Sequence, residues 1–211
     1  MTDAGNLAEA LASCNEQRVM SLLSEKLDAG TPAAEILSEC NQGMAELGNR
    51  FAGGHCFLPE LMFGGMIMKA ITAELAPLLE QSGPVEPVGK AVIGTVHHDV
   101  HDIGKDIVVM MLRGIGFEVV DLGVDVPPEK FIEAIAEHKP QVAGFSVLLT
   151  TCYKSVCDTA EAIGAAGLRD GLSLMVGGAA ASQLLAESAG CDFYGKTAVD
   201  GVKFAGQLVG V

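Results

Sequence analysis

Hydrophobic positions over the first 82 residues recur every three or four residues, which is the period of an amphipathic helix. Two short helices are expected first, and each has one apolar face. The first face consists of Leu7, Leu11 and Cys14, and the second of Val19, Leu22, Leu23 and Leu27.

Two longer helices follow. Thr31 and Pro32 have the character of an N-cap and a first helical residue, so they predict the start of a third helix that ends at the Gly53-Gly54 break. Its apolar positions are Ile36, Cys40, Met44 and Leu47. Pro59 opens a fourth helix, and Pro77 is expected to kink its last turn. Four helices with short connections predict an antiparallel four-helix bundle.

Beyond residue 89 the period changes, because short apolar runs alternate with helical stretches. The expected strands are Ala91–Val96, Phe117–Asp121, Val142–Val147, Leu172–Val176 and Asp192–Tyr194. The expected helices are near Ile103–Leu112, Glu129–Glu137, Thr151–Ala166, Ala181–Ala189 and Val199–Leu208. Five β/α units predict a doubly wound, flavodoxin-like α/β domain with a five-stranded parallel sheet.

Residues 82–89 contain two prolines and two glycines, a composition typical of a linker. We therefore place a helical domain at residues 1–84, a linker at 85–89 and an α/β domain at 90–211.

Charge and composition narrow the classes of function. The net charge is −14, of which residues 1–88 carry −8 and residues 89–211 carry −6. Two acidic halves disfavour nucleic acid and anionic membranes as partners. The sequence contains no run of 18 or more apolar residues, so no membrane span is expected. Residues 1–6 lack the features of a secretory signal. Six cysteines without a CxxC pair indicate reduced thiols, so a cytoplasmic location is expected and a cysteine zinc site is not.

The loop after the first strand concentrates the candidate chemistry, since it reads Thr95-Val-His-His-Asp-Val-His-Asp-Ile-Gly-Lys105. Ligands of doubly wound sheets bind at the carboxyl ends of strands. Asp99 can accept a hydrogen bond from one ring nitrogen of His101 and so prepare the other nitrogen to bind a metal. Other interpretations stay open. Asp99 or Asp102 can be an N-cap of the next helix, with Asp102 the better candidate. His97 and His98 can be ordinary strand-end residues, and His97 with His101 can mimic a metal pair.

The chain resembles the cobalamin-binding proteins of methyltransferase systems, in the arrangement known from methionine synthase. Their signature is Asp-x-His-x-x-Gly, then Ser-x-Leu, then Gly-Gly. Here it reads Asp99-Val-His101-Asp-Ile-Gly104, 41 intervening residues, Ser146-Val-Leu148, 28 intervening residues and Gly177-Gly178. Residues 1–88 resemble the helical cap domain of these proteins, especially over residues 48–60.

The resemblance implies a cofactor and roles for individual residues. The cofactor is cobalamin or a related corrinoid, present as methylcobalamin in turnover, with His101 as the lower axial ligand of cobalt and Asp99 holding His101. The residues implied to contact the corrinoid or its displaced nucleotide tail are Asp99, His101, Asp102, Ile103, Gly104, Ser146, Leu148, Thr150, Gly177 and Gly178. Without the resemblance, Gly177-Gly178 would be taken for an ordinary turn and Ser146 and Leu148 for strand residues. Met62, Phe63 and Met66 are candidates for an apolar cap over the upper corrin face, although methionines at helical spacing are commonly core.

Three positions depart from the family pattern. Some relatives complete a His–Asp–Ser relay with a serine six residues after the Ser-x-Leu serine, and here that position is Cys152. A thiol is a poor hydrogen-bond partner, which puts proton coupling in doubt. His98 stands where many relatives have glycine or an acid, and Asp106 stands where they commonly have asparagine.

The resemblance implies a corrinoid methyl carrier, a component of a methyltransferase or demethylase system rather than a stand-alone enzyme. A substrate-specific methyltransferase would transfer a methyl group from a methoxylated aromatic, methanol or a methylamine to cobalt(I), and an acceptor methyltransferase would pass it to a folate-like or thiol acceptor. A corrinoid-reactivating reductase is a further possible partner. The alternatives are a cobalamin-dependent sensor or regulator, a mutase subunit, and a receiver-like domain with a fortuitous motif.

Overall fold

The structure is a computed structural model that describes residues 6–81 and 87–211. The chain divides into two compact units that meet in sequence between residues 86 and 87, and each unit is described by itself. Residues 85 and 86 of the expected linker lie outside the described residues. No helix in the described part of the chain is both long and apolar enough to cross a membrane.

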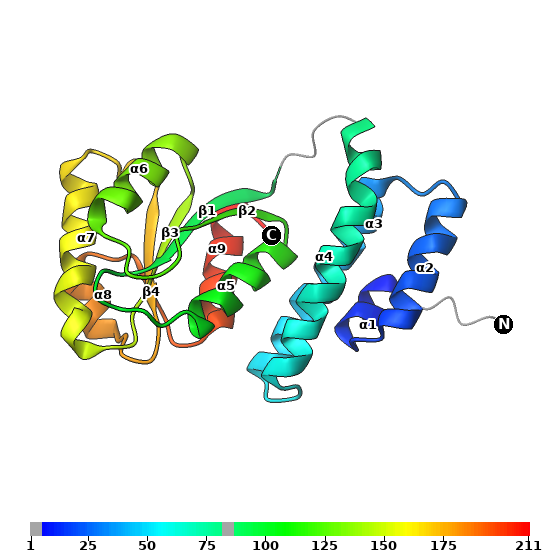
Figure 1. The fold of residues 1–211 in the computed structure, drawn as a ribbon, viewed down its shortest axis with the longest axis horizontal. Helices are drawn as coiled ribbons and strands as arrows, with labels where there is room; N and C mark the ends of the chain where they lie inside the picture. Colours follow the sequence, from blue (N-terminus) through cyan, green and yellow to red (C-terminus); the bar gives the residue numbers. More distant parts are fainter. Residues whose placement is uncertain (1–5, 82–86) are drawn as a thin grey trace. The chain divides into compact units, whose positions relative to one another are not determined.

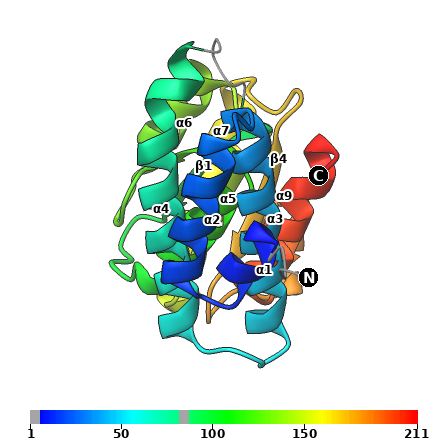
Figure 2. The same cartoon turned by 90° about the vertical axis from the view of Figure 1, so that its right-hand side faces the viewer.

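The first unit is helical in its described residues, as its hydrophobic period predicts. Its helices are α1 (Leu7–Ala12), α2 (Glu16–Asp28), α3 (Ala33–Ala52) and α4 (Leu58–Gln81). Figures 1 and 2 show α3 and α4 running alongside each other, with α1 packed on α3. Leu47 and Gly64 mark how closely α3 and α4 approach, because a Cβ on Gly64 would lie 2.2 Å from Leu47 Cδ2. Only glycine therefore fits at position 64 without a shift of the neighbouring side chain.

Two helix boundaries of this unit differ from the sequence prediction. Cys14 does not extend the apolar face of α1, because it lies in the following turn with φ 55°. Ser13 is the C-cap residue of α1, and its Oγ donates to the Glu9 carbonyl oxygen at 2.7 Å. The Asn15 side chain caps α2. Thr31 does not cap α3. That helix begins one residue later than expected, with Pro32 at the N-cap position, where φ is −57° and ψ is 134°.

The second unit is the predicted doubly wound α/β domain (Figure 1). Its strands are β1 (Gly89–Thr95), β2 (Phe117–Asp121), β3 (Val142–Ser146), β4 (Ser173–Gly177) and β5 (Phe193–Gly195). Its helices are α5 (Ile103–Gly114), α6 (Pro128–His138), the 3-10 turn η1 (Thr150–Cys152), α7 (Tyr153–Ala165), α8 (Gln183–Ala189) and α9 (Ala198–Val209). The strand order is β2-β1-β3-β4-β5 and every neighbouring pair is parallel, which is the flavodoxin-like order.

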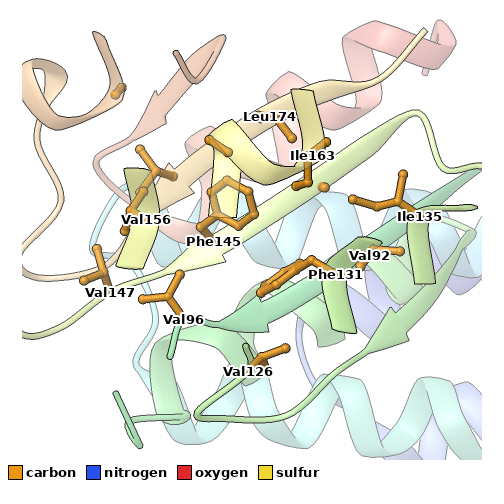
Figure 3. Close-up of a cluster of buried hydrophobic side chains, with 14 of the residues drawn as sticks. Val92, Val96, Val126, Phe131, Ile135, Phe145, Val147, Val156, Ile163 and Leu174 are labelled. Carbon is orange, nitrogen blue, oxygen red and sulfur yellow. The ribbon is translucent and has the colours of Figure 1, made fainter. Parts of the chain in front are cut away.

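Both faces of the sheet are covered, which explains why its strands are apolar runs rather than alternating patterns. Figure 1 shows α6 and α7 on one face and α5 and α9 on the other. Phe131 of α6 meets Phe145 of β3 edge to face, with ring centroids 5.1 Å apart, and Val92, Ile163 and Leu174 surround them (Figure 3). This buried cluster fixes β1 and β3 side by side and therefore positions the loops that leave their carboxyl ends.

Candidate functional site

The switch point of the sheet lies between β1 and β3, because the chain leaves these adjacent strands toward opposite faces. Their last residues, Thr95 and Ser146, are paired, and the row continues to Gly177 of β4 and Gly195 of β5. Small side chains therefore line the carboxyl edge of four strands. Ser146 and Gly177 were expected there from the sequence, whereas Thr95 and Gly195 were not.

Asp99 and His101 form a hydrogen-bonded pair in the loop after β1. The carboxylate oxygen Oδ1 of Asp99 lies 2.7 Å from Nδ1 of His101 and also accepts from the His101 backbone N–H at 3.2 Å. The Asp99 side chain is fully buried, while 46% of the His101 side chain is exposed. The buried carboxylate therefore holds in place an imidazole that is partly exposed.

The second carboxylate oxygen of Asp99 is also fully engaged. Oδ2 accepts from the backbone N–H groups of Leu148 at 2.6 Å and Leu149 at 3.2 Å, just beyond β3. Burial alone would raise the pKa of Asp99, but the hydrogen bonds from Leu148, His101 and Leu149 outweigh it and hold that pKa below its ordinary value. An ionised Asp99 fixes the proton of His101 on Nδ1 and leaves the lone pair on Nε2.

His101 is held through its backbone as well. The buried Thr95 side chain donates from Oγ1 to the His101 carbonyl oxygen at 2.8 Å. No Nε2 hydrogen bond of His101 occurs among the described residues. Thr95 was not predicted as a site residue, and the one sequence signal that could have found it is a polar residue at the end of an apolar strand.

Exposed apolar side chains lie next to the Asp99–His101 pair in the chain, near the start of α5, and just beyond β3. They are Val100, Ile103, Leu148 and Leu149, of which Ile103 is 68% exposed. Beside them, a Cβ built on Gly104 would meet no atom within 4 Å. Apolar exposure next to open space is typical of a surface that a flat apolar ligand covers.

The remaining motif residues occupy the same edge. Asp102 and Thr150 are exposed, and the Asp102 carbonyl oxygen accepts from Asp106 N at 2.8 Å, while no side-chain hydrogen bond of Asp102 occurs among the described residues. Gly178 has φ 115°, and a Cβ there would lie 2.2 Å from the Val147 carbonyl oxygen. Glycine is therefore required at position 178 by the backbone itself.

Cys152 does not replace the relay serine in its hydrogen bonding. It is buried at the end of η1, and its Sγ lies 3.9 Å from Thr151 Oγ1. The Asp99 carboxylate accepts from His101, Leu148 and Leu149, and no side-chain hydroxyl or thiol donates to it in the described part of the chain.

A second imidazole–carboxylate pair lies in the same loop. Nδ1 of His97 lies 2.7 Å from Oδ1 of Asp125, which also accepts from the His98 backbone N–H at 2.7 Å. The His98 N–H and the His97 ring hold the pKa of Asp125 below its ordinary value. The sequence did not single out Asp125, since it lies between β2 and α6, far from the motif.

Comparison with known proteins identifies this arrangement. Two family models, both described as a B12 binding domain, match residues 89–203 and residues 4–76. The chain belongs to the B12-binding family. It is 38% identical to the dimethylamine corrinoid protein of Methanosarcina barkeri over 203 residues, which is 96% of this chain and 95% of that protein.

Solved structures agree. A cobalamin-binding protein from Desulfitobacterium hafniense DCB-2 has a TM-score of 0.83 and 31% identity, with 99% of both chains covered. The methanol:cobalamin methyltransferase complex MtaBC from Methanosarcina barkeri has a TM-score of 0.85 and 28% identity, covering all of this chain and 81% of that one. The predicted family and the predicted corrinoid cofactor are thereby confirmed.

The residues present fit the B12 cofactor of this family. His101 offers an imidazole nitrogen whose opposite nitrogen is hydrogen-bonded to a buried carboxylate, a donor suited to cobalt. The open space at Gly104 and the exposed apolar side chains offer room and contact for a macrocycle. The row of Thr95, Ser146 and Gly177 offers a lining of small side chains.

The candidate cap residues lie on α4 in the first unit. Met62, Phe63 and Met66 are exposed, Met66 by 66%, and Phe57 just before α4 is exposed as well. The two methionines are therefore not core side chains, and the role of all three residues as a cap remains a prediction.

Proposed function

We propose that this chain is the methyl-carrying corrinoid subunit of a methyltransferase system and that His101 is the lower axial ligand of its cobalt. The observation that carries the proposal is the pair of a fully buried Asp99 and a half-exposed His101 at the switch point of the sheet. The near full-length similarity to the dimethylamine corrinoid protein supports the same function. A bound corrinoid supplies a cobalt ion that accepts a methyl group from one enzyme and yields it to another.

Each residue of the site then has a defined task. Asp99 keeps the proton on Nδ1 of His101, so that Nε2 is the donor atom. Thr95 fixes the backbone of His101, and the N–H groups of Leu148 and Leu149 fix Asp99. Ile103 and Leu148 would contact the corrin face, with Asp102 and Thr150 at its rim. Gly104, Ser146, Gly177 and Gly178 would border the nucleotide tail.

The helical domain completes the proposal. Met62, Phe63 and Met66 would cover the upper corrin face and shield cobalt(I) from water and oxygen. The domain boundaries proposed from the sequence are 1–84 and 90–211, and a hinge in the linker at 82–89 would let partner enzymes reach the cobalt.

The partners are a substrate-specific methyltransferase, an acceptor methyltransferase acting on a folate-like or thiol acceptor, and a corrinoid-reactivating reductase. The names of the relatives favour a methylamine or methanol as the methyl donor over a methoxylated aromatic. A panel of these donors, incubated with candidate methyltransferases and the reconstituted full chain, identifies the donor from methylation of the cobalt.

Electron paramagnetic resonance of the cobalt(II) form tests the axial ligand. Full-length protein is reconstituted with hydroxocobalamin, freed of excess ligand and reduced. We expect nitrogen superhyperfine splitting in the parent and in His138→Gln, a matched histidine control on α6, and its loss in His101→Ala. Splitting that survives in His101→Ala, or a chain that retains no corrinoid, would contradict the proposal.

A further inference from the structure

Three metal-ligating side chains converge beside the corrinoid site. They are His97 and His98 from the loop after β1 and Asp125 from the segment between β2 and α6. One potential ligand atom of each lies within 4.8 Å of the others. The two imidazole rings are only 3.7 Å apart between centroids. None of these residues has a task in the proposed methyl-carrying function.

The donor set is that of a borderline divalent cation. Two imidazoles and one carboxylate suit Zn²⁺ and its neighbours, and zinc ligand atoms lie about 3.4 Å apart around a tetrahedral ion. The three atoms here are already within 4.8 Å of one another, so side-chain rotations would complete that spacing around an ion. The His97 and Asp125 side chains are 40% and 50% exposed, so an ion has access and a fourth position is left for water.

The backbone gives an independent reason to assign a role to these side chains. His98 has φ 70° and Asp125 has φ 53°, so both are non-glycine residues in the left-handed region. Glycine adopts this conformation without strain, and a side chain there persists at a cost. The two strained residues face each other, because the His98 N–H donates to Asp125 Oδ1 at 2.7 Å.

The segment between β2 and α6, which contains Asp125, is hydrogen-bonded to the loop after β1 that carries Asp99 and His101. The Asp125 N–H donates to the Asp99 carbonyl oxygen at 2.8 Å, and Val126 N–H donates to the Thr95 carbonyl oxygen at 3.0 Å. An ion held by His97, His98 and Asp125 would therefore cross-link two loops that also position Asp99. Binding there would stiffen the support of the axial ligand without touching it.

We propose that His97, His98 and Asp125 form a binding site for a borderline divalent transition-metal ion such as Zn²⁺, separate from the cobalt. A simpler role exists for Asp125, which caps the His98 N–H and the His97 ring without any ion. The two roles differ in whether the imidazoles contribute binding energy for a metal, and this difference is measurable. The inference does not depend on the proposed methyl-carrying function.

A zinc titration of the chelator-treated, cofactor-free full chain tests the site. Binding is measured by calorimetry at a pH above the ordinary imidazole pKa of about 6.5. We expect one Zn²⁺ per chain. His97→Gln and His98→Gly should each weaken binding at least about tenfold, since even residues that only orient a ligand contribute that much. Asp125→Asn keeps an acceptor for the His98 N–H but removes the charge, so it should weaken binding as well.

Two histidine variants serve as controls. Zinc affinity should be unchanged in His138→Gln and in His101→Ala. Absence of binding, binding that persists unchanged in His97→Gln and His98→Gly, or loss of binding in His101→Ala would each overturn the inference.

Cobalt spectra of the same variants after reconstitution separate this inference from the proposed function. Axial nitrogen splitting in His97→Gln and His98→Gly, together with no zinc binding to the parent, would refute the zinc site alone. Loss of the axial nitrogen in His98→Gly together with its survival in His101→Ala would refute His101 as the cobalt ligand and also the assignment of His98 to a separate site.

Discussion

Two histidine–aspartate pairs lie beyond the end of β1, and the distance between the ring nitrogen and the carboxylate oxygen is the same in both. Nδ1 of His101 to Oδ1 of Asp99 and Nδ1 of His97 to Oδ1 of Asp125 are both 2.7 Å. Their surroundings differ, since the Asp99 side chain is fully buried and that of Asp125 is half-exposed. A short contact therefore does not define a role. Burial and the remaining partners of the carboxylate do.

The buried pair has little freedom. Asp99 accepts from His101 and from two backbone N–H groups beyond β3, so it joins the two loops of the switch point. The exposed pair leaves oxygens and ring nitrogens open to solvent or to an ion. A fixed donor suits a cofactor that stays bound, whereas an open set suits an ion that exchanges.

Replacing each aspartate by asparagine should give the largest difference between the two pairs, measured as the loss of folding stability. Asp99→Asn places an amide N–H₂ among buried N–H donors, so at least one donor loses its acceptor, and we expect about 2–4 kcal/mol of lost stability. Asp125→Asn should change stability by no more than about 0.5 kcal/mol, because its side chain is half-exposed.

Tyrosine fluorescence during urea unfolding measures the loss of stability in each asparagine variant, and it reports on the α/β unit alone. The chain has two tyrosines, Tyr153 and Tyr194, and no tryptophan, and both tyrosines lie in the α/β unit. Equal losses of stability in the two asparagine variants would show that burial does not distinguish the pairs.

Gly104→Ala should weaken corrinoid binding at the Asp99–His101 pair without changing zinc binding at the His97–Asp125 pair. The new methyl group meets no protein atom within 4 Å, so the folded state should be unharmed, or up to about 1 kcal/mol more stable because residue 104 is helical. It would occupy space assigned to the corrinoid, and overpacking of that kind costs about 1–3 kcal/mol of binding. Hydroxocobalamin affinity measures the change, and zinc affinity should not follow it. Unchanged corrinoid affinity would argue against the proposed position of the cofactor.

The strands were predictable because each parallel strand is buried on both faces and reads as an apolar run. Their ends were not. The first strand was expected at Ala91–Val96, but β1 covers Gly89–Thr95, because Gly89 pairs with Phe117 while Val96 leaves the ladder to bridge Val126. Such pairings depend on a neighbouring strand that local sequence does not specify.

The buried pair was also predictable, since Asp99 and His101 stand in a spaced motif. Its supports were not. Leu149 acts through a backbone N–H, which any residue provides, and Thr95 acts from a strand otherwise read as core. Asp125 is distant in sequence and reaches the loop only through the pairing of β1 with β2.

The buried carboxylate of Asp99 should make the stability of the folded chain depend on pH in the acid range. The pKa of Asp99 is held below its ordinary value in the folded chain, whereas an unfolded aspartate titrates near about 3.9. Its stabilising contribution is therefore fully present above that value and is lost as the pH falls through the folded pKa. Urea unfolding from about pH 5 to pH 3 should show a shallower loss of stability in Asp99→Asn than in the parent. Identical pH dependence would mean that Asp99 does not carry this linkage.

The smallest expected effect concerns the backbone of the exposed pair. His98 has φ 70°, which strains a side chain, so His98→Gly should raise stability by about 0.5 kcal/mol after the larger entropy of the unfolded chain is allowed for. The hydrogen bond from residue 98 N–H to Asp125 survives, because it needs no side chain. His97→Gly is the matched control. Position 97 is not in the left-handed region, so glycine there should lower stability by about 0.5–1 kcal/mol. Urea midpoints read from Tyr153 and Tyr194 resolve the two signs. A loss of stability in both variants would mean that the His98 ring stabilises the metal-free fold, and its strain would then be explained without an ion.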